Sequence, residues 1–445
     1  MEFLELVQKY NKSVPRYTSY PSVPFWKGLP QRKTWLDSLN KIEPQDSWSL
    51  YLHLPFCESL CSFCGCTKII TKNHGKEEAY VQLLADELSL YLENCPALKQ
   101  IPLRQIHLGG GSPTFFSAES LEKILANIVS KVYIDKNHFE GSVEADPRRT
   151  NAEQLKVFKK YGFNRLSLGV QDFDEAVQKT VNRLQPYEMT EKLTLLARDM
   201  GFESINFDLI YGLPKQTLSS MEETLKKVIE LKPDRVAFYS FAFVPWLKPS
   251  QKLFDLEDLP SADLKWRFYL MAQDYFVNAG YCEIGIDHFS LPSDALSHAK
   301  KDQRLHRNFM GYTDLKTDYL IGLGLSAISE TKDCYHQNLK DLTQYQNAII
   351  NKSFATEKGH VLSAGEKIAK EQIQNLMTHF STELETNQIQ ALQNELSDFS
   401  CDHLIELKKQ TLKVLDKGRP FVRNICALLD PYYGGTQDSQ FSKTI

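Results

Sequence analysis

Four of the nine cysteines of the chain fall within one short stretch, CESLCSFCGC, which runs from Cys57 to Cys66. Its members are Cys57, Cys61, Cys64 and Cys66, with the spacing C-x3-C-x2-C-x-C. The other cysteines stand singly, at positions 95, 282, 334, 401 and 426. Because thiolates are preferred ligands of soft metals and of iron–sulfur clusters, this density predicts a metal or cluster site.

Three chemical interpretations of this cysteine cluster compete. An odd and mostly scattered set of cysteines suits a reducing compartment better than a disulfide framework. A structural zinc site favours two C-x2-C pairs separated by a longer loop, and the remaining cysteines supply no second pair. A 4Fe–4S cluster fits best, because a short loop of thiolates can wrap around one cube.

The spacing of the first three cysteines is more specific. Cys57, Cys61 and Cys64 give three ligands to a cube and leave one iron without a protein ligand. This pattern resembles that of the radical S-adenosylmethionine enzymes. The resemblance implies that the methionine moiety of S-adenosylmethionine chelates the open iron and is cleaved to a 5′-deoxyadenosyl radical. We leave Cys66 out of the ligand set, because its spacing from Cys64 makes joint coordination of the cube awkward. Its expected role is to support the site or to act as an alternative ligand.

Composition restricts the class of protein. A chain of 445 residues predicts a large catalytic domain with an appendage. A net charge of −4 gives no reason to expect a nucleic-acid partner. The first residues lack the pattern of a secretory signal, and no stretch is apolar for long enough to span a membrane. We therefore expect a cytoplasmic protein without a nucleic-acid or membrane partner.

Short β-type runs alternate with helical stretches after the cysteine cluster. The runs begin at Ser49, Gln105, Glu140, Arg165, Ser204 and Val236, and CEIGIDHF at Cys282 is a candidate seventh. Such alternation predicts parallel strands with right-handed crossovers. We expect an α/β fold, a partial open (β/α)6 TIM-like barrel, with a doubly wound sheet as the alternative.

Three regions follow from these patterns. Residues 1–46 form an N-terminal extension, for which a lid is the hypothesis, and residues 47–295 form the barrel. Residues 296–445 are expected to be a mainly helical domain, with a winged-helix-like unit as one form. YLIGLGLSAIS at Tyr319 is either one more buried strand or a loop returning to the site.

The unusual residues follow the expected strands at their carboxyl ends, where ligands gather in barrels. They are Cys57, the glycines of GGGSPT, Glu144, Gln171, Asp208 and Ala242. Tyr51 and His53 alternate in SLYLHLPF, so both face the same side of the first strand. Each residue also has a structural explanation, as a tight turn, a solvated acid or a buried hydrogen-bonding group.

The ordered set of motifs resembles the family of oxygen-independent coproporphyrinogen III oxidases, also called coproporphyrinogen dehydrogenases, almost end to end. The motifs are PRYTSYP, YLHLPFCESLCSFCGC, HLGGGSPT, VEADPR, GFNRLSLGVQDF, VNR, DLIYGLPKQT, IDHFSLPSD, LHRNFMGYT, GLGLSAIS and RNIC. Haem-chaperone relatives typically lack PRYTSYP and the cysteine after FCG. The chain departs from the family at SFAFVP, where Phe241 and Phe243 replace a polar aromatic pair.

The resemblance implies decarboxylation of two propionates of coproporphyrinogen III to vinyl groups, giving protoporphyrinogen IX for haem synthesis without O2. It implies a 4Fe–4S cluster and one or two bound S-adenosylmethionine molecules. Catalytic roles are expected for Tyr51 and His53. The first cofactor is expected against Tyr51, Glu144, Ala242 and Ile328. The second site is expected to share or adjoin Phe63, Gly110, Gly111, Ser112, Gln171, Arg183 and Asp208.

A tetracarboxylate substrate needs cations, and Arg16 and Arg307 are the candidates for pairing with propionates. We expect a monomer served by an external electron donor and an external acceptor. Two other functions remain open at this point. One is a haem-binding or haem-trafficking protein, and the other is a radical methyltransferase that acts on tetrapyrroles.

Overall fold

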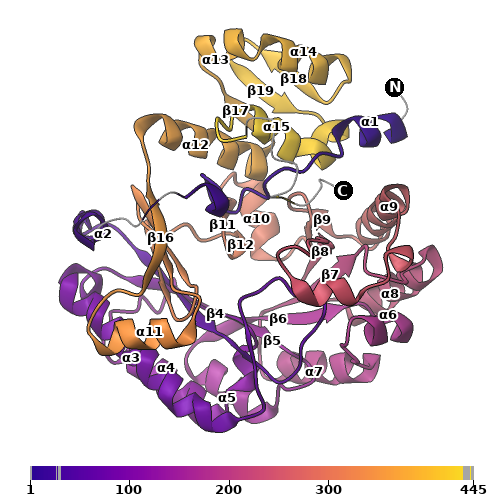
Figure 1. Ribbon diagram of the computed structural model, residues 1–445. Coiled ribbons are helices and arrows are strands. Elements are labelled where there is room, and N and C mark those ends of the chain that lie inside the picture. The colour runs from indigo at the N-terminus through magenta and orange to yellow at the C-terminus, as the bar shows by residue number, and fades with distance from the viewer. Residues whose placement is uncertain (1–2, 27, 29–31, 434–440, 442–445) are drawn as a thin grey trace.

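A twelve-stranded sheet dominates the computed structural model, which describes residues 3–26, 28, 32–433 and 441 (Figure 1). The strands follow the order β16-β15-β14-β13-β1-β4-β5-β6-β7-β8-β10-β9. Their bounds are β1 Trp48–Leu54, β4 Leu103–Gly110, β5 Glu140–Ala145, β6 Phe163–Gln171, β7 Ser204–Tyr211, β8 Arg235–Ser240, β9 Cys282–Glu283, β10 His288–Ser290, β13 Tyr319–Leu323, β14 Ile328–Glu330, β15 Cys334–Asn338 and β16 Thr356–Val361.

The middle of the sheet is the expected barrel. The strands from β13 through β1 and β4 to β8 all pair in parallel. Helices cover the outside of the curved sheet: α3 Glu77–Asn94, α4 Ala118–Val129, α5 Ala152–Lys160, α6 Glu175–Thr180, α7 Tyr187–Asp199, α8 Leu218–Leu231 and α9 Ala262–Asn278 (Figure 1). The prediction of a partial open (β/α)6 barrel is thus confirmed.

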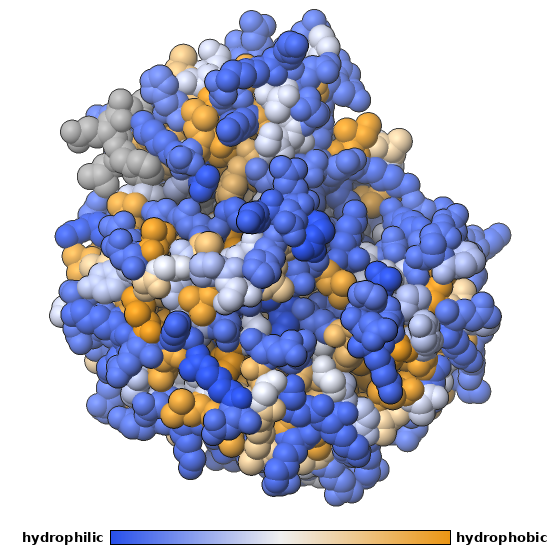
Figure 2. All heavy atoms as spheres, turned by 180° about the vertical axis from the view of Figure 1, so that it is seen from behind, coloured by the Kyte–Doolittle hydropathy of each residue, from blue (hydrophilic) through white to orange (hydrophobic). Residues whose placement is uncertain are grey.

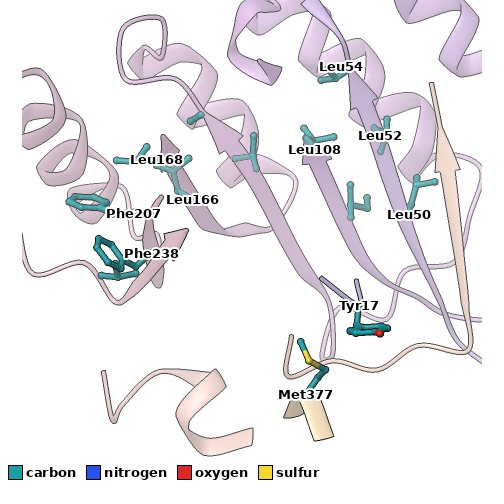
Figure 3. Close-up of a cluster of buried hydrophobic side chains, with 14 of the residues drawn as sticks. Tyr17, Leu50, Leu52, Leu54, Leu108, Leu166, Leu168, Phe207, Phe238 and Met377 are labelled. Carbon is teal, nitrogen blue, oxygen red and sulfur yellow. The ribbon is translucent and has the colours of Figure 1, made fainter. Parts of the chain in front are cut away.

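Alternation along β1 explains how one strand serves both the core and the interior. Leu50, Leu52 and Leu54 are fully buried and belong to the same hydrophobic cluster as leucines of α3 (Figure 3). Tyr51 and His53 point to the opposite face, because successive side chains of a strand alternate. Burying one face against helices fixes the register, and the other face becomes available to the barrel interior.

The sheet continues beyond residue 295, where the sequence predicted the barrel to end. Residues 319–323 form β13, which pairs in parallel with β1, and β14 to β16 add three antiparallel strands as far as Val361. The segment at Cys282 is not a seventh parallel strand, since β9 and β10 pair antiparallel at the other edge. The expected boundary is corrected to lie after residue 361.

The remaining residues form a small unit that is mainly helical, as expected, and that also contains a three-stranded sheet. Helix α12 (Ala364–His379) begins at Ser363, whose side chain forms a capping box with Glu366. It is followed by a three-stranded antiparallel sheet and further helices (Figure 1). These elements are β17 Ser381–Glu383, α13 Thr386–Ala391, α14 Gln393–Cys401, β18 Ile405–Lys408, β19 Thr411–Val414 and α15 Val422–Leu428.

Shorter elements complete the chain. They are α1 Phe3–Tyr10, α2 Arg32–Leu39, β2 Phe56–Cys57, β3 Ile69–Ile70, α10 Ala295–Lys301, β11 His306–Asn308, β12 Gly311–Thr313 and α11 Leu342–Ile350. Within the described residues, no helix is long and apolar enough to cross a membrane. On the face shown in Figure 2, hydrophilic residues cover most of the area and hydrophobic residues form small scattered patches.

Residues 9–26, called the N-terminal strap below, contact both sides of the open barrel. Arg16 Nη2 donates to the carbonyl oxygen of Ser240, at the end of β8, over 2.8 Å. At the other side Lys358 Nζ of β16 donates to Val23 O over 2.7 Å, and Trp26 stacks on Tyr335 of β15. The strap therefore bridges the gap that the sheet leaves open (Figure 1).

Candidate active site

A cavity of about 390 Å³ runs along the inner face of the parallel strands, from their first residues to their carboxyl ends. Parallel pairing brings the strand ends to one edge, so residues far apart in sequence share this space. The predicted site residues that line it are Cys57, Cys61, Phe63, Cys64, Gly110, Gly111, Ser112, Glu144, Gln171, Arg183 and Asp208. Tyr51, His53, Ala242, Ile328, Arg16 and Arg307 are not among the lining residues.

Backbone hydrogen bonds hold the cysteine loop at the mouth of the cavity. Ser62 N donates to Val181 O over 3.0 Å, and the side chain of Asn182 donates to Leu60 O over 2.8 Å. Strands β2 and β3 pair in parallel on the far side of the loop. The loop conformation is thus fixed by its neighbours and does not depend on bonds between sulfurs.

Cys61 is the most enclosed of the clustered cysteines, and two guanidinium groups face its sulfur. Arg183 Nη1 lies 3.6 Å and Arg148 Nη2 lies 3.7 Å from Cys61 Sγ. Asp146 binds Arg148 in a fork, and Arg183 Nη1 lies 3.4 Å from Asp146 Oδ2. Burial opposes ionisation of Asp146, but the charges of Arg183 and Arg148 prevail and lower its pKa to about 2.

The donor set fits an iron–sulfur cube. Within the described part of the chain, no three His, Cys, Asp or Glu side chains converge on a single metal ion. A cube does not need such convergence, because each cysteine binds a different iron. Burial raises the pKa of Cys57 to about 12, and the side-chain hydrogen bond from Cys66 lowers that of Cys64 to about 6. Metal coordination deprotonates thiols outright, so both can serve as ligands.

Arg183 offers a second sign of fit. Its Nη2 donates to Gly169 O over 2.6 Å, and its buried Nε has no hydrogen-bond partner among the described residues. A buried donor without a partner is costly, and an anionic ligand group would satisfy it. The carboxylate of S-adenosylmethionine is a group of this kind.

The glycines of GGGSPT are explained by packing. A Cβ on Gly111 would collide with the carbonyl oxygen of Pro55, and one on Gly110 would lie 2.9 Å from the His53 ring. Gly110 also has φ +118, which favours glycine. Its N–H donates to Glu144 Oε2 over 3.2 Å, and Glu144 keeps 45% of its side chain exposed. The Glu144 carboxylate therefore retains capacity to accept hydrogen bonds from a ligand.

Strands β7 and β6 place two further polar groups in the cavity: Asp208 lies within β7, and not at its end as expected, while Gln171 ends β6. Asp208 accepts hydrogen bonds from Ser167 Oγ at 2.8 Å and Asn206 Nδ2 at 2.9 Å. Burial raises the pKa of Asp208 to about 6. Gln171 ends β6 with φ 69, a left-handed conformation at a register shift in the strand pairing. Left-handed residues other than glycine are concentrated at functional sites.

Tyr51 and His53 lie behind the cysteine loop. His53 Nε2 is 2.8 Å from Thr67 O, which can only accept, so Nε2 carries the proton. Nδ1 must then accept from the Tyr51 hydroxyl, 3.0 Å away. Burial lowers the pKa of His53, in agreement with a neutral ring. These contacts favour a supporting role, and a direct catalytic role stays a prediction.

Ala242 and Ile328 are placed by backbone contacts near the two sides of the site. Gln251 is almost fully buried and donates to Ala242 O at 3.1 Å and Phe63 O at 3.4 Å, so it joins the loop after β8 to the cysteine loop. Ile328 begins β14, close to Gly322 of β13. At the departure from the family pattern, Phe241 and Phe243 join an apolar cluster that includes Phe63.

The positive charges of Arg16 and Arg307 both act on the carboxylate of Asp287, beside β10. Burial opposes ionisation of Asp287, but the charges of His288, Arg307 and Arg16 lower its pKa. Arg307 lies over the ring of Tyr312, 4.8 Å from its centroid. Its buried Nε and Nη1 find no hydrogen-bond partner among the residues that the structure describes.

Sequence reasoning did not single out Arg148, Asp146 or Gln251. Arg148 and Asp146 stand in the motif VEADPR, in which Glu144 was the residue interpreted as part of the site. A basic residue two positions after an acidic one at a strand end was the available signal. Nothing in the sequence near Gln251 distinguishes it from an ordinary surface glutamine.

Comparisons with known proteins agree with this site. A model of the Radical SAM superfamily matches residues 51–228, which defines the class of enzyme. Oxygen-independent coproporphyrinogen III oxidases of Pseudomonas aeruginosa and Salmonella typhimurium are 36% and 37% identical, and each alignment covers 99% of this chain and 98% of the relative. The structure of coproporphyrinogen III oxidase from Escherichia coli matches with a TM-score of 0.89 and 34% identity, over 96% of this chain and 98% of that one.

The chain belongs to the family of oxygen-independent coproporphyrinogen III oxidases within the Radical SAM superfamily. It is therefore a radical S-adenosylmethionine oxidoreductase, with a 4Fe–4S cluster and S-adenosylmethionine as its cofactors. Cys57, Cys61 and Cys64 are the residues that would hold the cluster.

Proposed function

We propose that this protein converts coproporphyrinogen III to protoporphyrinogen IX without O2, by turning the propionates of rings A and B into vinyl groups for haem synthesis. The observation that carries the proposal is the single cavity that joins the cysteine loop to the polar strand ends, in a chain whose named relatives match it along its length. Bound cluster and S-adenosylmethionine supply a carbon radical that takes a hydrogen atom.

The reaction needs such chemistry because a propionate β C–H bond is not acidic enough for any side chain to deprotonate. Loss of one hydrogen atom, CO2 and one electron turns each propionate into a vinyl group. The chain itself forms the cavity in which this reaction is proposed to occur. Glu144 and Arg183 offer an acceptor and an anion-binding donor to the cofactor, and the strand ends of β5 to β7 line the wall behind them.

Recognition of the carboxylates is the proposed role of Arg16 and Arg307. Arg16 donates to Ser240 O at the end of β8. Arg307 lies over Tyr312, whose ring contacts His288 of β10, the strand that pairs with β8. Arg307 has buried donors without protein partners, which a propionate would satisfy as a charge-assisted pair. The N-terminal strap brings Arg16 to Ser240 and so completes this cationic region.

Electron balance defines the partners. Cleavage of the sulfonium consumes an electron, and each decarboxylation releases one, so an external donor and an external acceptor are both proposed. A monomer in the cytoplasm is the simplest arrangement, and size-exclusion chromatography of reconstituted protein checks the oligomeric state. A second S-adenosylmethionine stays a prediction, which a count of bound cofactor per chain decides.

The test of function is an anaerobic assay of reconstituted protein with coproporphyrinogen III, S-adenosylmethionine and a reductant. Vinyl-porphyrinogen product with release of CO2 supports the proposal. Stoichiometric haem binding without CO2 release would instead indicate haem trafficking, and a methylated tetrapyrrole would indicate a methyltransferase.

The role of Arg307 has its own test, the KM for coproporphyrinogen III in Arg307→Met. A hydrogen bond to a charged group contributes about 1.5–3 kcal/mol, so the KM should rise about tenfold or more. Arg304→Met is the matched control, because Arg304 precedes the same hairpin, is more than half exposed and pairs with Asp302. An unchanged KM in Arg307→Met contradicts this role. An unchanged KM in Arg16→Ala would likewise contradict the role of Arg16.

A further inference from the structure

Two positively charged side chains, and not one, face the sulfur of Cys61. Arg183 was expected near the cofactor from the family resemblance. Arg148 was not expected there, yet its Nη2 lies 3.7 Å from Cys61 Sγ, within hydrogen-bonding range of a sulfur. Cys61 is buried, so water does not screen this contact strongly.

The position of Arg148 is fixed by its own acidic partner. Its Nε lies 2.9 Å from Asp146 Oδ1, and its Nη2 lies 2.7 Å from Asp146 Oδ2. The carboxylate also accepts from the backbone N–H of Arg148 at 3.0 Å, which closes a tight local turn. A planar guanidinium held in a fork keeps its remaining N–H directions constant, and one of them points at the sulfur.

The neighbouring arginine provides a comparison within the same cavity. Arg149 also lines the cavity, but it pairs with Glu58 at 2.7 Å and keeps 46% of its side chain exposed. Arg148 is exposed by only 16%. No hydrogen bond from Arg149 to a cysteine sulfur is present in the described residues, so the two arginines differ in contact and not in charge.

We propose that Arg148 is a positioning residue that sets the reduction potential of the cluster through its hydrogen bond to the Cys61 sulfur. A ligand sulfur that accepts a hydrogen bond donates less negative charge to iron, and a nearby cation stabilises the more negative reduced cluster. Both effects raise the reduction potential. Removing Arg148 also leaves Asp146 near the cluster without its fork partner, which lowers the potential further.

The experiment is a redox titration of anaerobically reconstituted protein, followed by electron paramagnetic resonance, without substrate or S-adenosylmethionine. Arg148→Met should shift the equilibrium toward the oxidised cluster about tenfold, which is about 59 mV for a one-electron couple. Arg149→Met should shift it by much less, because an exposed charge is screened. Arg148→Lys keeps the charge and should recover part of the shift.

Asp146→Asn provides the opposite sign, because it removes a negative charge of nearly the same shape and should raise the potential. If Arg148→Met takes up no cluster, the other two variants test the inference. The reduction potential should then be lower than that of the wild type in Arg148→Lys and higher in Asp146→Asn. Equal potentials in Arg148→Met and Arg149→Met overturn the inference. Weaker binding of S-adenosylmethionine at an unchanged potential also overturns it, since Arg148 would then act on the cofactor.

The inference rests on the cysteine loop holding a cluster and does not involve the substrate. Iron and sulfide in the wild-type protein are therefore counted first. Absence of a cluster there would contradict the proposed function itself, whereas a normal cluster with an unchanged potential in Arg148→Met contradicts only the inference.

Discussion

Arg423, on helix α15, donates through Nε to the carbonyl oxygen of Pro15, 3.0 Å away. Its Nη2 also contacts Val14 O, and the neighbouring Asn424 donates to Tyr10 O over 2.9 Å. The N-terminal strap is thus attached to the C-terminal unit immediately before Arg16, the residue that crosses to β8. Arg423 in α15 thus helps to fix the position from which Arg16 reaches β8.

Arg423→Met should therefore weaken substrate binding without touching the cysteine loop. Loss of the two carbonyl contacts frees the strap near Arg16, so the KM for coproporphyrinogen III should rise by about tenfold. Iron content per chain should stay at the wild-type value. Lys408→Met is the control, since Lys408 belongs to the same unit but is 75% exposed and pairs with Glu406. A normal KM in Arg423→Met would show that Arg16 is placed without this contact.

His53→Ala should reduce the iron that the protein retains after reconstitution. His53 Nε2 supports Thr67 O, directly after Cys66, so its removal loosens the end of the cysteine loop. Tyr51→Phe should have a smaller effect, because His53 keeps its bond to Thr67. Iron and sulfide are measured per chain in both variants. Full iron content in His53→Ala would contradict the supporting role.

Glu87 makes stability depend on pH. Its carboxylate is fully buried and accepts from Tyr345 Oη and Gly324 N, each at 2.7 Å, and from Asn338 Nδ2 at 2.6 Å. Burial nevertheless raises its pKa to about 7. Between the ordinary value of 4.5 and about 7, the folded state binds a proton that the unfolded state has lost. Stability is therefore full below 4.5 and falls as the pH rises through 7, by about 3 kcal/mol.

Glu87→Gln should flatten this dependence, because glutamine stays neutral. Unfolding by urea at pH 5 and pH 8 measures it, with the larger loss of stability between the two pH values expected in the wild type. Glu119→Gln, at a side chain that is 80% exposed, should leave the dependence unchanged. If the unfolding free energy changes equally between pH 5 and pH 8 in Glu87→Gln and in the wild type, the Glu87 carboxyl of the folded protein is already ionised at pH 5.

Leu52→Ala tests the packing of β1 against the outer helices. Leu52 is fully buried in the main hydrophobic cluster, and removing such a side chain costs about 2–5 kcal/mol of unfolding free energy. Leu195→Ala on α7, where the side chain is 52% exposed, should cost much less. Urea unfolding compares the two, and a small loss in Leu52→Ala would indicate that the core collapses around the space.

The parallel strands of the barrel were predictable because each is long enough to show its pattern. Apolar residues alternate with polar ones along much of β4 and β6, and the ends of these strands place Gly110 and Gln171. Strands of three residues, such as β14, leave no periodicity to detect. The longer strands of the same edge, β15 (CYHQN) and β16 (TEKGHV), are mostly polar. The antiparallel edge was therefore not predicted, and the barrel was expected to end at residue 295.

The sequence predicted which strand face the site residues share, but it did not predict the contacts that they make. Alternation correctly gave Tyr51 and His53 a common face, but it could not reveal that the loop ending at Thr67 covers that face. The contact between Arg148 and Cys61 joins two distant segments, since Arg148 follows β5 and Cys61 lies in the loop after β2. Contacts of this kind arise only when the barrel closes, so local sequence does not report them.

The bond between Pro15 and Arg423 also has a consequence for biosynthesis. A ribosome that has translated as far as Cys66 has already produced every thiol of the cluster loop, while helix α15, which secures the strap, begins only at Val422. Until α15 exists, the strap lacks its contacts with Arg423 and Asn424. The strap can therefore close over the front of the barrel only after α15 has been synthesised.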